Sequence, residues 1–262
     1  MPDHTWDPDR YLVYADERGR PFHDLLARVR APDPRHVVDL GCGPGNLTAL
    51  LSKRWPAAEV LGVDSSSAMV DRARAAAPGV RFEVGDLRHW SPGGPSSAGS
   101  GGVDVVVSNA TLQWVPGHLG LLPTLVSHLA SRGCLAFQVP GNFDAPSHVL
   151  LDDLSRDPRF APYLGEVARP ESHEPQVYAD ALLDLGLSVD AWETTYLHLL
   201  QGPDPVFTWV SGTGARPVLE ALPDDLREEL AAGYRAALRE AYPAGRHGTV
   251  LPFRRVFLVA TR

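Results

Sequence analysis

A glycine-rich segment near position 40 carries the strongest chemical signal in the chain. It reads Asp39-Leu40-Gly41-Cys42-Gly43-Pro44-Gly45, and its glycines allow a tight turn whose backbone can approach a ligand without a side-chain clash. A dinucleotide-binding turn follows the pattern Gly-x-Gly-x-x-Gly, but position 46 is Asn46. Asp39 also stands where a carboxylate would repel a pyrophosphate and attract a positive group. The segment therefore favours a cationic ligand.

Two further carboxylates follow, each at the end of an expected strand. Asp64 lies about 20 residues after the loop, where a carboxylate can accept hydrogen bonds from both hydroxyls of a ribose. Asp86, in the pair Gly85-Asp86, ends the next strand, where it can accept a hydrogen bond from the exocyclic amine of adenine. Each aspartate alone is also typical of a turn or a helix cap. Three at successive strand ends point to one ligand site.

The elements that must position these residues alternate between strand and helix. Apolar runs predict strands at 36–40, 60–63, 80–84, 103–107 and 134–139, and helices at 11–30, 46–55, 68–77 and 119–130. Such alternation is typical of a parallel sheet that helices cover on both faces. Ligands of these sheets bind beyond the carboxyl ends of the strands, which is where the three aspartates are expected.

The second half of the chain is less regular, and we expect it to complete a single domain over residues 1–262. Helical patterns at 144–165, 175–185 and 204–242 accompany strand patterns at 189–199 and 255–260. Asp224 or Asp225 is expected to cap a helix. Residues 1–35 are expected to form an N-terminal flap and helix, and segments 141–174 and 200–250 a helical lid over the active site. The Gly-, Ser- and Pro-rich segment 91–102 predicts a surface loop.

Composition argues against several classes of protein. The 262 residues carry a net charge of −8, which argues against binding nucleic acid through bulk charge. No apolar run reaches the roughly 18 residues of a membrane span. The two cysteines, Cys42 and Cys134, lie far apart, so a reducing, cytoplasmic compartment fits best. The histidines lack metal-ligand spacing, so no metal is expected. We expect a monomer or a weak homodimer.

This set of residues resembles the class I S-adenosylmethionine-dependent methyltransferases. Asp39–Gly45 is similar to their first motif, Asp64 to their ribose-binding acid and Gly85-Asp86 to their adenine-side acid. The resemblance implies a doubly wound, mostly parallel, seven-stranded Rossmann-like α/β sheet with S-adenosyl-L-methionine as cofactor. That molecule is positively charged and has no phosphate, in agreement with an acidic loop. The cofactor-binding residues expected on this basis are Asp39, Gly41, Cys42, Gly43, Gly45, Asp64, Ser65, Gly85, Asp86, Leu87 and Asn109, with Trp6 and Tyr11 from the flap.

Segments along almost the whole chain resemble the bacterial trans-aconitate 2-methyltransferases. They include Asn109-Ala110-Thr111-Leu112-Gln113-Trp114, Thr194-Thr195-Tyr196-Leu197-His198 and the C-terminal run from Arg254 to Arg262; the long segment 91–102 is the main departure. The resemblance implies methyl transfer to a carboxylate of trans-aconitate, giving a monomethyl ester and S-adenosylhomocysteine. A carboxylate is already ionised at pH 7, since free carboxyl pKa values lie near ~4. We therefore expect no general base.

A tricarboxylate also needs partners for the carboxylates that do not react. Arginine binds carboxylates through paired hydrogen bonds, and Lys53 is the only lysine. The candidate substrate-binding residues are Arg20, Gln113, Trp114, His148, Arg216 and Arg255, of which Gln113 and Trp114 are expected to position the reacting carboxylate. The alternatives are solvated ion pairs for the arginines, a hydrophobic wall for the tryptophan and a structural role for the histidine.

Two other functions stay open from the residues alone. The same cofactor could serve another small acid, a phenol or a carbon centre. A nucleotide-binding oxidoreductase or a catalytically silent binding module would belong to another class. Asn46 and the position of Asp39 argue against a nicotinamide cofactor, and a silent module would not need all three aspartates.

Overall fold

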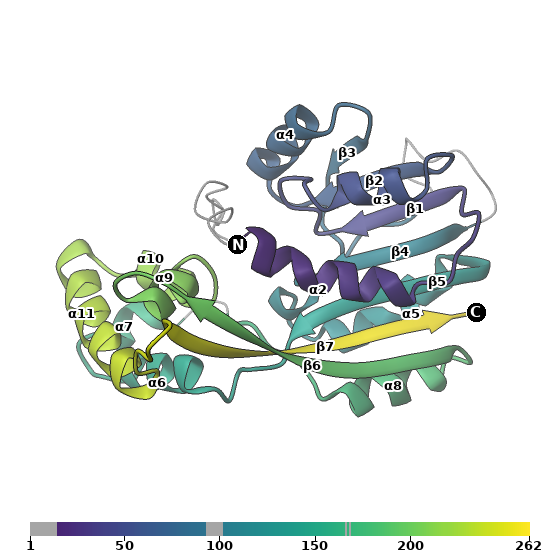
Figure 1. The fold of residues 1–262 in the computed structure, drawn as a ribbon. Coiled ribbons are helices and arrows are strands. Elements are labelled where there is room, and N and C mark those ends of the chain that lie inside the picture. The colour runs from purple at the N-terminus through teal and green to yellow at the C-terminus, as the bar shows by residue number, and fades with distance from the viewer. Residues whose placement is uncertain (1–14, 93–101, 166, 168) are drawn as a thin grey trace. The chain divides into compact units, whose positions relative to one another are not determined.

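Seven strands form one sheet in the computed structural model, which describes residues 15–92, 102–165, 167 and 169–262. The strand order is β3-β2-β1-β4-β5-β7-β6 (Figure 1). The strands are β1 (His36–Leu40), β2 (Glu59–Asp64), β3 (Arg81–Val84), β4 (Val103–Asn109), β5 (Leu129–Pro140), β6 (Ser188–Leu200) and β7 (Thr249–Thr261). The predicted seven-stranded α/β fold is confirmed.

The register of the sheet brings the predicted ligand residues to one edge. β3, β2, β1, β4 and β5 are parallel neighbours, and β7 runs opposite to β5 and β6 (Figure 1). Asp39 lies opposite Gly62 of β2, and Asp64 lies opposite Val84 of β3. The carboxyl ends of β1, β2 and β3 therefore lie side by side.

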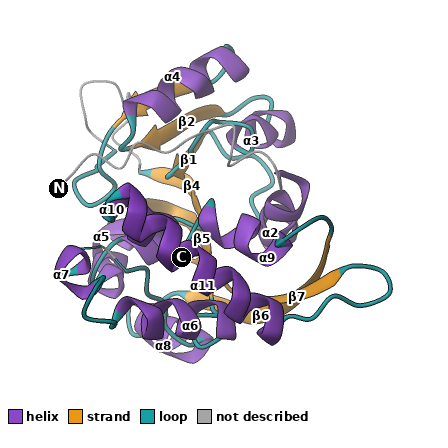
Figure 2. Cartoon of the chain, turned by 90° about the vertical axis from the view of Figure 1, so that its left-hand side faces the viewer, coloured by secondary structure: helices purple, strands orange, loops and turns teal. Residues whose placement is uncertain are grey.

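Helices cover both faces of this sheet. Figures 1 and 2 show α2 (Ala15–Arg28) and α3 (Thr48–Arg54) on one side of the central strands and α5 (Leu122–Ser127) and α8 (Pro175–Leu183) on the other. The α5 and α8 face buries Leu122, Leu125 and Tyr178 against apolar strand residues in one cluster. On the α4 (Ser67–Ala76) side, Val70 and Ala73 pack with Cys42 and Phe82.

Two helix starts differ in how they are capped. At α4, the hydroxyl of Ser66 accepts a hydrogen bond from the Met69 backbone N–H at 3.4 Å. At α11 (Asp224–Ala241) the predicted aspartate cap is wrong. Pro223 occupies the cap position, and Asp224 and Asp225 already lie in the first helical turn, where their charges stabilise the positive end of the helix dipole.

Three element boundaries also differ from the sequence interpretation. The helix expected at 119–130 is two shorter pieces, the 3-10 helix His118–Leu121 and α5, because β5 already begins at Leu129. β7 begins at Thr249, since its first half alternates buried and exposed residues and only its second half is a continuous apolar run. Cys134 lies inside β5 rather than at its start.

The chain separates into two compact units. The first comprises Met1–Val139, Ser172–Glu193 and Val256–Arg262, and the second comprises Pro140–Glu171 and Thr194–Arg255. The second unit contains α6 (Pro146–Ser155), α7 (Ala161–Leu164), α9 (Pro205–Ser211), α10 (Arg216–Ala221) and α11. Most of both predicted lid segments belong to it, and their role as a lid stays a prediction. Residues 1–14 of the predicted flap lie outside the described residues.

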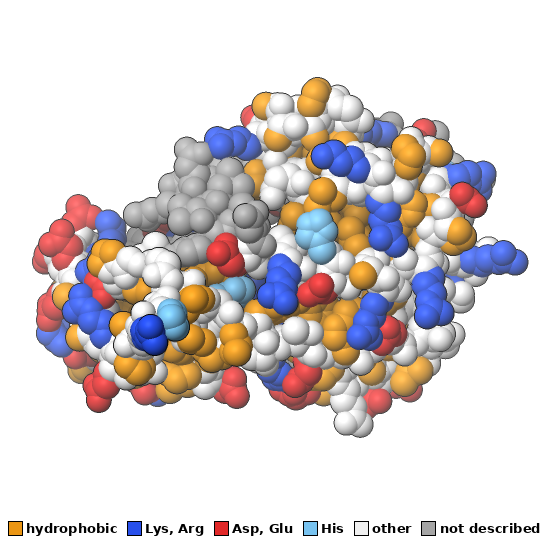
Figure 3. Space-filling view, viewed as in Figure 1, with side chains coloured by type: hydrophobic (Ala, Val, Ile, Leu, Met, Phe, Trp, Pro, Cys, Tyr) orange, Lys and Arg blue, Asp and Glu red, His pale blue; other side chains and the backbone are white. Residues whose placement is uncertain are grey.

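The surface gives two further observations. Figure 3 shows arginine and lysine side chains interspersed with aspartate and glutamate over the visible face. Over the described ranges, none of the helices combines the length and the apolar character needed to cross a bilayer.

Gly45 provides a test of how the glycine loop packs on α4. Its φ is +79°, and a Cβ there would lie 2.7 Å from the Cβ of Ala73 and 2.9 Å from its Cα. We expect Gly45→Ala to lower the free energy of unfolding by about 2–4 kcal/mol in urea denaturation. The cost of a left-handed backbone at an alanine and the cost of overpacking against Ala73 add together. Gly79→Ala is the control, since no described atom lies within 4 Å of its Cβ position. Equal losses in the two variants would contradict this packing.

Candidate functional site at the carboxyl ends of the strands

The glycine loop is tied directly to the end of β2. The backbone N–H groups of Gly41 and Cys42 both donate to the carbonyl of Val63, at 2.7 and 3.1 Å. A Cβ on Gly41 would overlap the side chain of Thr111 at 2.1 Å, so only glycine fits there. Gly43, with a φ of +54°, has no described atom within 4 Å of its Cβ position. The loop is therefore packed at Gly41 and open at Gly43, where a ligand can approach the backbone.

Asp64 holds this loop and the start of α4 together. Its Oδ2 accepts a hydrogen bond from the N–H of Gly43 and its Oδ1 from the N–H of Ser66, each at 2.9 Å. Burial raises the pKa of Asp64, and these two hydrogen bonds oppose the rise. A carboxylate oxygen has two acceptor positions, so each oxygen still has capacity for a ligand hydroxyl.

Asp39 is a buried carboxylate with one unmet hydrogen bond. The residue is only 2% exposed to solvent. Oδ2 accepts from the hydroxyl of Thr48 at 2.6 Å, whereas Oδ1 has no hydrogen-bond partner among the described residues. Burial raises the pKa of Asp39 to about 7, the Thr48 hydrogen bond lowers it and the charge of Asp64 raises it again. A positive ligand group beside Oδ1 would satisfy this atom and relieve the repulsion.

Asp86 lies one step farther along the same edge and has a partner of its own. Both of its carboxylate oxygens accept hydrogen bonds from the Nε of Arg88, at 3.0 and 2.9 Å. These contacts lower the pKa of Asp86, although partial burial opposes the effect. The preceding Gly85 donates its N–H to the carbonyl of Asp64 at 2.9 Å, and Leu87 packs against the main core. Binding of a ligand amine by Asp86 stays a prediction.

The end of β4 adds a second group of polar residues to the edge. The Oδ1 of Asn109 accepts a hydrogen bond from the Nε2 of Gln138 at 2.7 Å. The chain then turns through Ala110, whose φ is +54°, into the 3-10 helix Leu112–Trp114. Gln113 is 4% exposed; its Nε2 donates to the Ala110 carbonyl at 2.6 Å, and its Oε1 has no described partner. Trp114 is half-buried.

The structure groups the predicted site residues in two sets. The first unit holds the predicted cofactor residues Asp39, Gly41, Cys42, Gly43, Gly45, Asp64, Ser65, Gly85, Asp86, Leu87 and Asn109, together with Gln113 and Trp114 and with Arg20 on α2. The second unit holds His148, Arg216 and Arg255. Trp6 and Tyr11 lie outside the described residues.

The three substrate candidates of the second unit differ in their surroundings. Arg255 of β7 is 5% exposed, and its guanidinium lies 4.6 Å from the ring centre of Phe253. Arg216 at the start of α10 forms an ion pair with Glu220 at 2.6 Å. Burial lowers the pKa of His148 to about 4, with an opposing effect from Asp144. At pH 7 the histidine is therefore neutral.

Two threonines complete the site and were not singled out in the sequence. Thr48 supplies the hydrogen bond to Asp39 from the first turn of α3, and Thr111 fills the space above Gly41 while its hydroxyl lies 3.3 Å from the Gly41 carbonyl. A polar residue in the first turn after the glycine loop could have indicated Thr48. No sequence pattern indicates Thr111, because its contact depends on how β4 pairs with β1.

Neither cysteine is an activated nucleophile. Burial raises the pKa of the Cys42 thiol far above its usual range and that of Cys134 to about 11. Both thiols are therefore protonated at pH 7. Within the described ranges, no group of three or more His, Cys, Asp or Glu side chains is placed to hold a metal ion.

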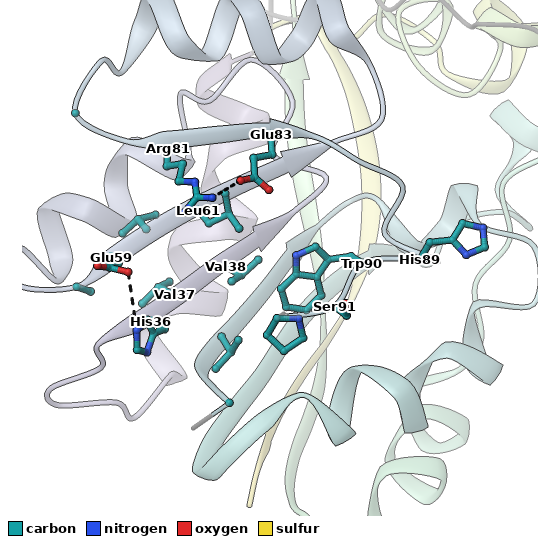
Figure 4. A pocket seen from close by; sticks show the side chains of 16 residues that line it. His36, Val37, Val38, Glu59, Leu61, Arg81, Glu83, His89, Trp90 and Ser91 are labelled. Carbon is teal, nitrogen blue, oxygen red and sulfur yellow. Dashed lines mark hydrogen bonds and ion pairs between the residues drawn. The ribbon is translucent and has the colours of Figure 1, made fainter. Parts of the chain in front are cut away.

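A hollow of about 580 Å³ lies at the other end of the sheet. Figure 4 shows His36, Glu59 and Arg81 lining it, and these residues begin β1, β2 or β3. The Nε2 of His36 lies 3.9 Å from a carboxylate oxygen of Glu59, and an ion pair joins Arg81 to Glu83 (Figure 4). Because ligands of open α/β sheets bind at the carboxyl ends of the strands, the edge with Asp39 and Asp64 is the better candidate site.

The raised pKa of Asp39 makes stability depend on pH. An aspartate in the unfolded chain has a pKa near ~3.9, so the folded protein binds more protons between about pH 4 and pH 7. The contribution of protonated Asp39 to the free energy of unfolding is therefore lost as the pH rises through that window. We expect Asp39→Asn to be more stable than the wild type at pH 8, because the amide removes the buried charge and can still accept from Thr48.

Urea unfolding at pH 5 and pH 8 measures this effect. The stability difference between Asp39→Asn and wild type should be larger at pH 8 by a few kcal/mol, on the scale of about 1.4 kcal/mol for each pKa unit. Asp33→Asn, at an exposed position of the first unit, is the control and should show no such difference. A wild type that is the more stable protein at pH 8 would refute the assignment.

Comparison with known proteins shows the family of the chain. The methyltransferase domain family matches residues 37–133, the segment from β1 to the middle of β5. A trans-aconitate 2-methyltransferase of Streptomyces avermitilis is 53% identical over 98% of this chain and 96% of its own length. The corresponding protein of Mycolicibacterium gilvum is 50% identical over 97% of this chain and 98% of its own.

Solved structures support the fold. An S-adenosylmethionine-dependent methyltransferase of Mesorhizobium loti is similar with a TM-score of 0.52 and 20% identity, over 94% of this chain and 98% of that chain. Geranyl diphosphate C-methyltransferase of Streptomyces coelicolor is similar with a TM-score of 0.53 and 18% identity, over 93% of this chain and 76% of that one. With relatives at about half identity over nearly its whole length, the chain belongs to the methyltransferase family that includes the trans-aconitate 2-methyltransferases.

Proposed function

We propose that this methyltransferase moves a methyl group from S-adenosyl-L-methionine to a carboxylate of trans-aconitate. The products are a monomethyl ester and S-adenosylhomocysteine. The observation that carries the proposal is the unmet oxygen of buried Asp39 beside Asp64 and the open backbone at Gly43. The names of relatives that are 46–53% identical over almost the whole chain support the choice of acceptor.

The residues at the strand ends fit the proposed cofactor. The Oδ1 atom of Asp39 suits a positively charged ammonium group, which would supply its missing partner. Asp64 retains acceptor positions for the two hydroxyls of a ribose, and Gly43 leaves room for close approach to the backbone. When bound, the cofactor supplies a methyl group on a positively charged sulfur. Ser65, Gly85, Asp86, Leu87 and Asn109 are assigned to the same site, as are Trp6 and Tyr11 of the N-terminal segment.

The proposed chemistry requires orientation rather than proton transfer. A carboxylate is ionised at pH 7, so no residue has to remove a proton from the acceptor. We assign Gln113 and Trp114 the task of holding the reacting carboxylate in line with the methyl group. Gln113 is buried and has one amide N–H left after its bond to Ala110. Exclusion of water and a fixed approach are the main sources of rate in such a reaction.

The remaining carboxylates of the acceptor need positive partners. We assign this task to Arg20, Arg216 and Arg255, with His148 as a neutral hydrogen-bond donor. Arg255 is the strongest of these candidates, because a charge at a residue 5% exposed is poorly screened by water. Segments 141–174 and 200–250 are proposed to act as the lid. A cytoplasmic monomer or weak homodimer that needs no metal or nucleic acid completes the proposal.

Incubation with a panel of acceptors tests the proposed function. The purified chain, with labelled S-adenosyl-L-methionine, is offered trans-aconitate, citrate, succinate and 4-hydroxybenzoate, and products are identified by mass spectrometry. We expect a monomethyl ester of trans-aconitate, formed with a kcat/KM at least about tenfold above the others, equal to about 1.4 kcal/mol. Methylation of the phenol alone, or of none of the acids, would overturn the proposed acceptor.

Arg255 and Arg216 give a sharper test of acceptor recognition. We expect Arg255→Gln and Arg216→Gln to raise the KM for trans-aconitate by about 10- to 100-fold, since a charge-assisted hydrogen bond contributes about 1.5–3 kcal/mol. The dissociation constant of S-adenosylhomocysteine, measured by calorimetry, should stay the same. Arg156→Gln is the matched control, because that arginine is exposed and pairs with Asp153. An unchanged KM in both site variants would remove these arginines from the acceptor site.

A further inference from the structure

We propose that the side-chain amide of Asn142 binds a carboxylate of the acceptor. This inference rests on the proposed function and adds a residue to it. Asn142 belongs to the second unit and lies two residues after Pro140, the last residue of β5. The amide is neutral, so it would recognise a carboxylate without adding a charge to those of the arginines.

The backbone holds Asn142 in place from both sides. The N–H of Gly141 donates to the Arg254 carbonyl at 3.0 Å, and the Arg254 Nη1 donates to the Gly141 carbonyl at 3.1 Å. On the other side, the carbonyl of Asn142 accepts from the N–H of Ala145 at 3.0 Å, in the turn that leads into α6. The turn is thus closed by main-chain groups, and no hydrogen bond among the described residues uses the Asn142 side chain.

The side chain itself is buried at a cost. Asn142 is 4% exposed, and neither its Nδ2 nor its Oδ1 has a hydrogen-bond partner among the described residues. Each buried polar group without a partner costs about 1–3 kcal/mol, and such groups are rare in folded proteins. A leucine of similar size would avoid this cost. The amide therefore destabilises the free protein, and a bound ligand is a physical reason for retaining it.

The neighbouring segment indicates which ligand. Gly141 and Arg254 are hydrogen-bonded to each other, so Asn142 and Arg255 each directly follow one member of this pair. The buried guanidinium and the buried amide on adjacent segments both have N–H groups that can donate hydrogen bonds to a carboxylate. The amide N–H groups would donate to a carboxylate oxygen, and a water molecule carried with that carboxylate would donate to Oδ1.

Substitution by leucine separates binding from stability. In Asn142→Leu we expect the KM for trans-aconitate to rise at least tenfold, while the thermal midpoint is unchanged or higher and S-adenosylhomocysteine binds as in the wild type. Asn142→Asp has nearly the same shape but repels a carboxylate, so its KM should rise further. Calorimetric titration of trans-aconitate into the protein saturated with S-adenosylhomocysteine measures acceptor binding directly. Gln176→Leu, at an exposed amide on α8, is the matched control.

The outcomes distinguish this inference from the function on which it rests. A wild type that esterifies trans-aconitate, together with an unchanged KM in Asn142→Leu, overturns the role of Asn142 and leaves the proposed function intact. A lower thermal midpoint with unchanged acceptor binding also overturns it, because the amide would then be structural. A wild type that esterifies none of the acids overturns both. If Asn142→Leu does not fold, the KM and the calorimetric affinity of Asn142→Asp for trans-aconitate test the role of Asn142 instead.

Discussion

The paired hydrogen bonds that Asp64 accepts from Gly43 and Ser66 are the constraint on which the site depends. They join the glycine loop, the end of β2 and the first turn of α4 through one carboxylate. Without them, the N–H of Gly43 would lose its hydrogen bond, and the loop would keep the bonds of Gly41 and Cys42 to Val63, of Gly45 to Cys42 and of Thr111 to Gly41. Because the Asp64 carboxylate also keeps free acceptor positions, the same side chain can both fix the loop and accept hydrogen bonds from a ligand bound beside it.

A second carboxylate close to Asp64 sets the electrostatic character of this edge. Asp39 and Asp64 repel each other, and burial adds to the cost of each charge. Like charges in a poorly solvated place are tolerated when a positive ligand offsets them, and such groups concentrate at functional sites. The free protein is therefore less stable than it could be at neutral pH, and a cationic cofactor would recover part of that energy on binding.

The sequence was sufficient for those parts of the structure that depend on local pattern. Asp39, Asp64 and Asp86 each follow an apolar run, so their place at strand ends could be predicted from strand periodicity and the rule that parallel strands share a carboxyl edge. The partners of these residues could not be predicted. The Thr111 side chain meets Gly41 only because β4 pairs with β1, and the ion pair of Asp86 with Arg88 depends on a turn with no distinctive pattern. The first half of β7 was missed because Pro252 and Arg254 interrupt its apolar run.

Among the described residues, Asp39, Gln113 and Asn142 each have a buried polar side-chain atom without a hydrogen-bond partner, as does His128 at its Nδ1. An oxygen of Asp39 and one of Gln113 belong to the first unit, and both polar atoms of Asn142 belong to the second. The other side-chain polar atom of Asp39 is hydrogen-bonded to Thr48, and that of Gln113 is hydrogen-bonded to Ala110. Both side chains therefore stabilise the local structure even though one of their atoms has no partner. The Asn142 side chain has no such structural benefit, because main-chain hydrogen bonds already close its turn. A buried amide that contributes nothing to its own surroundings is explained most directly by a group that arrives from outside the chain.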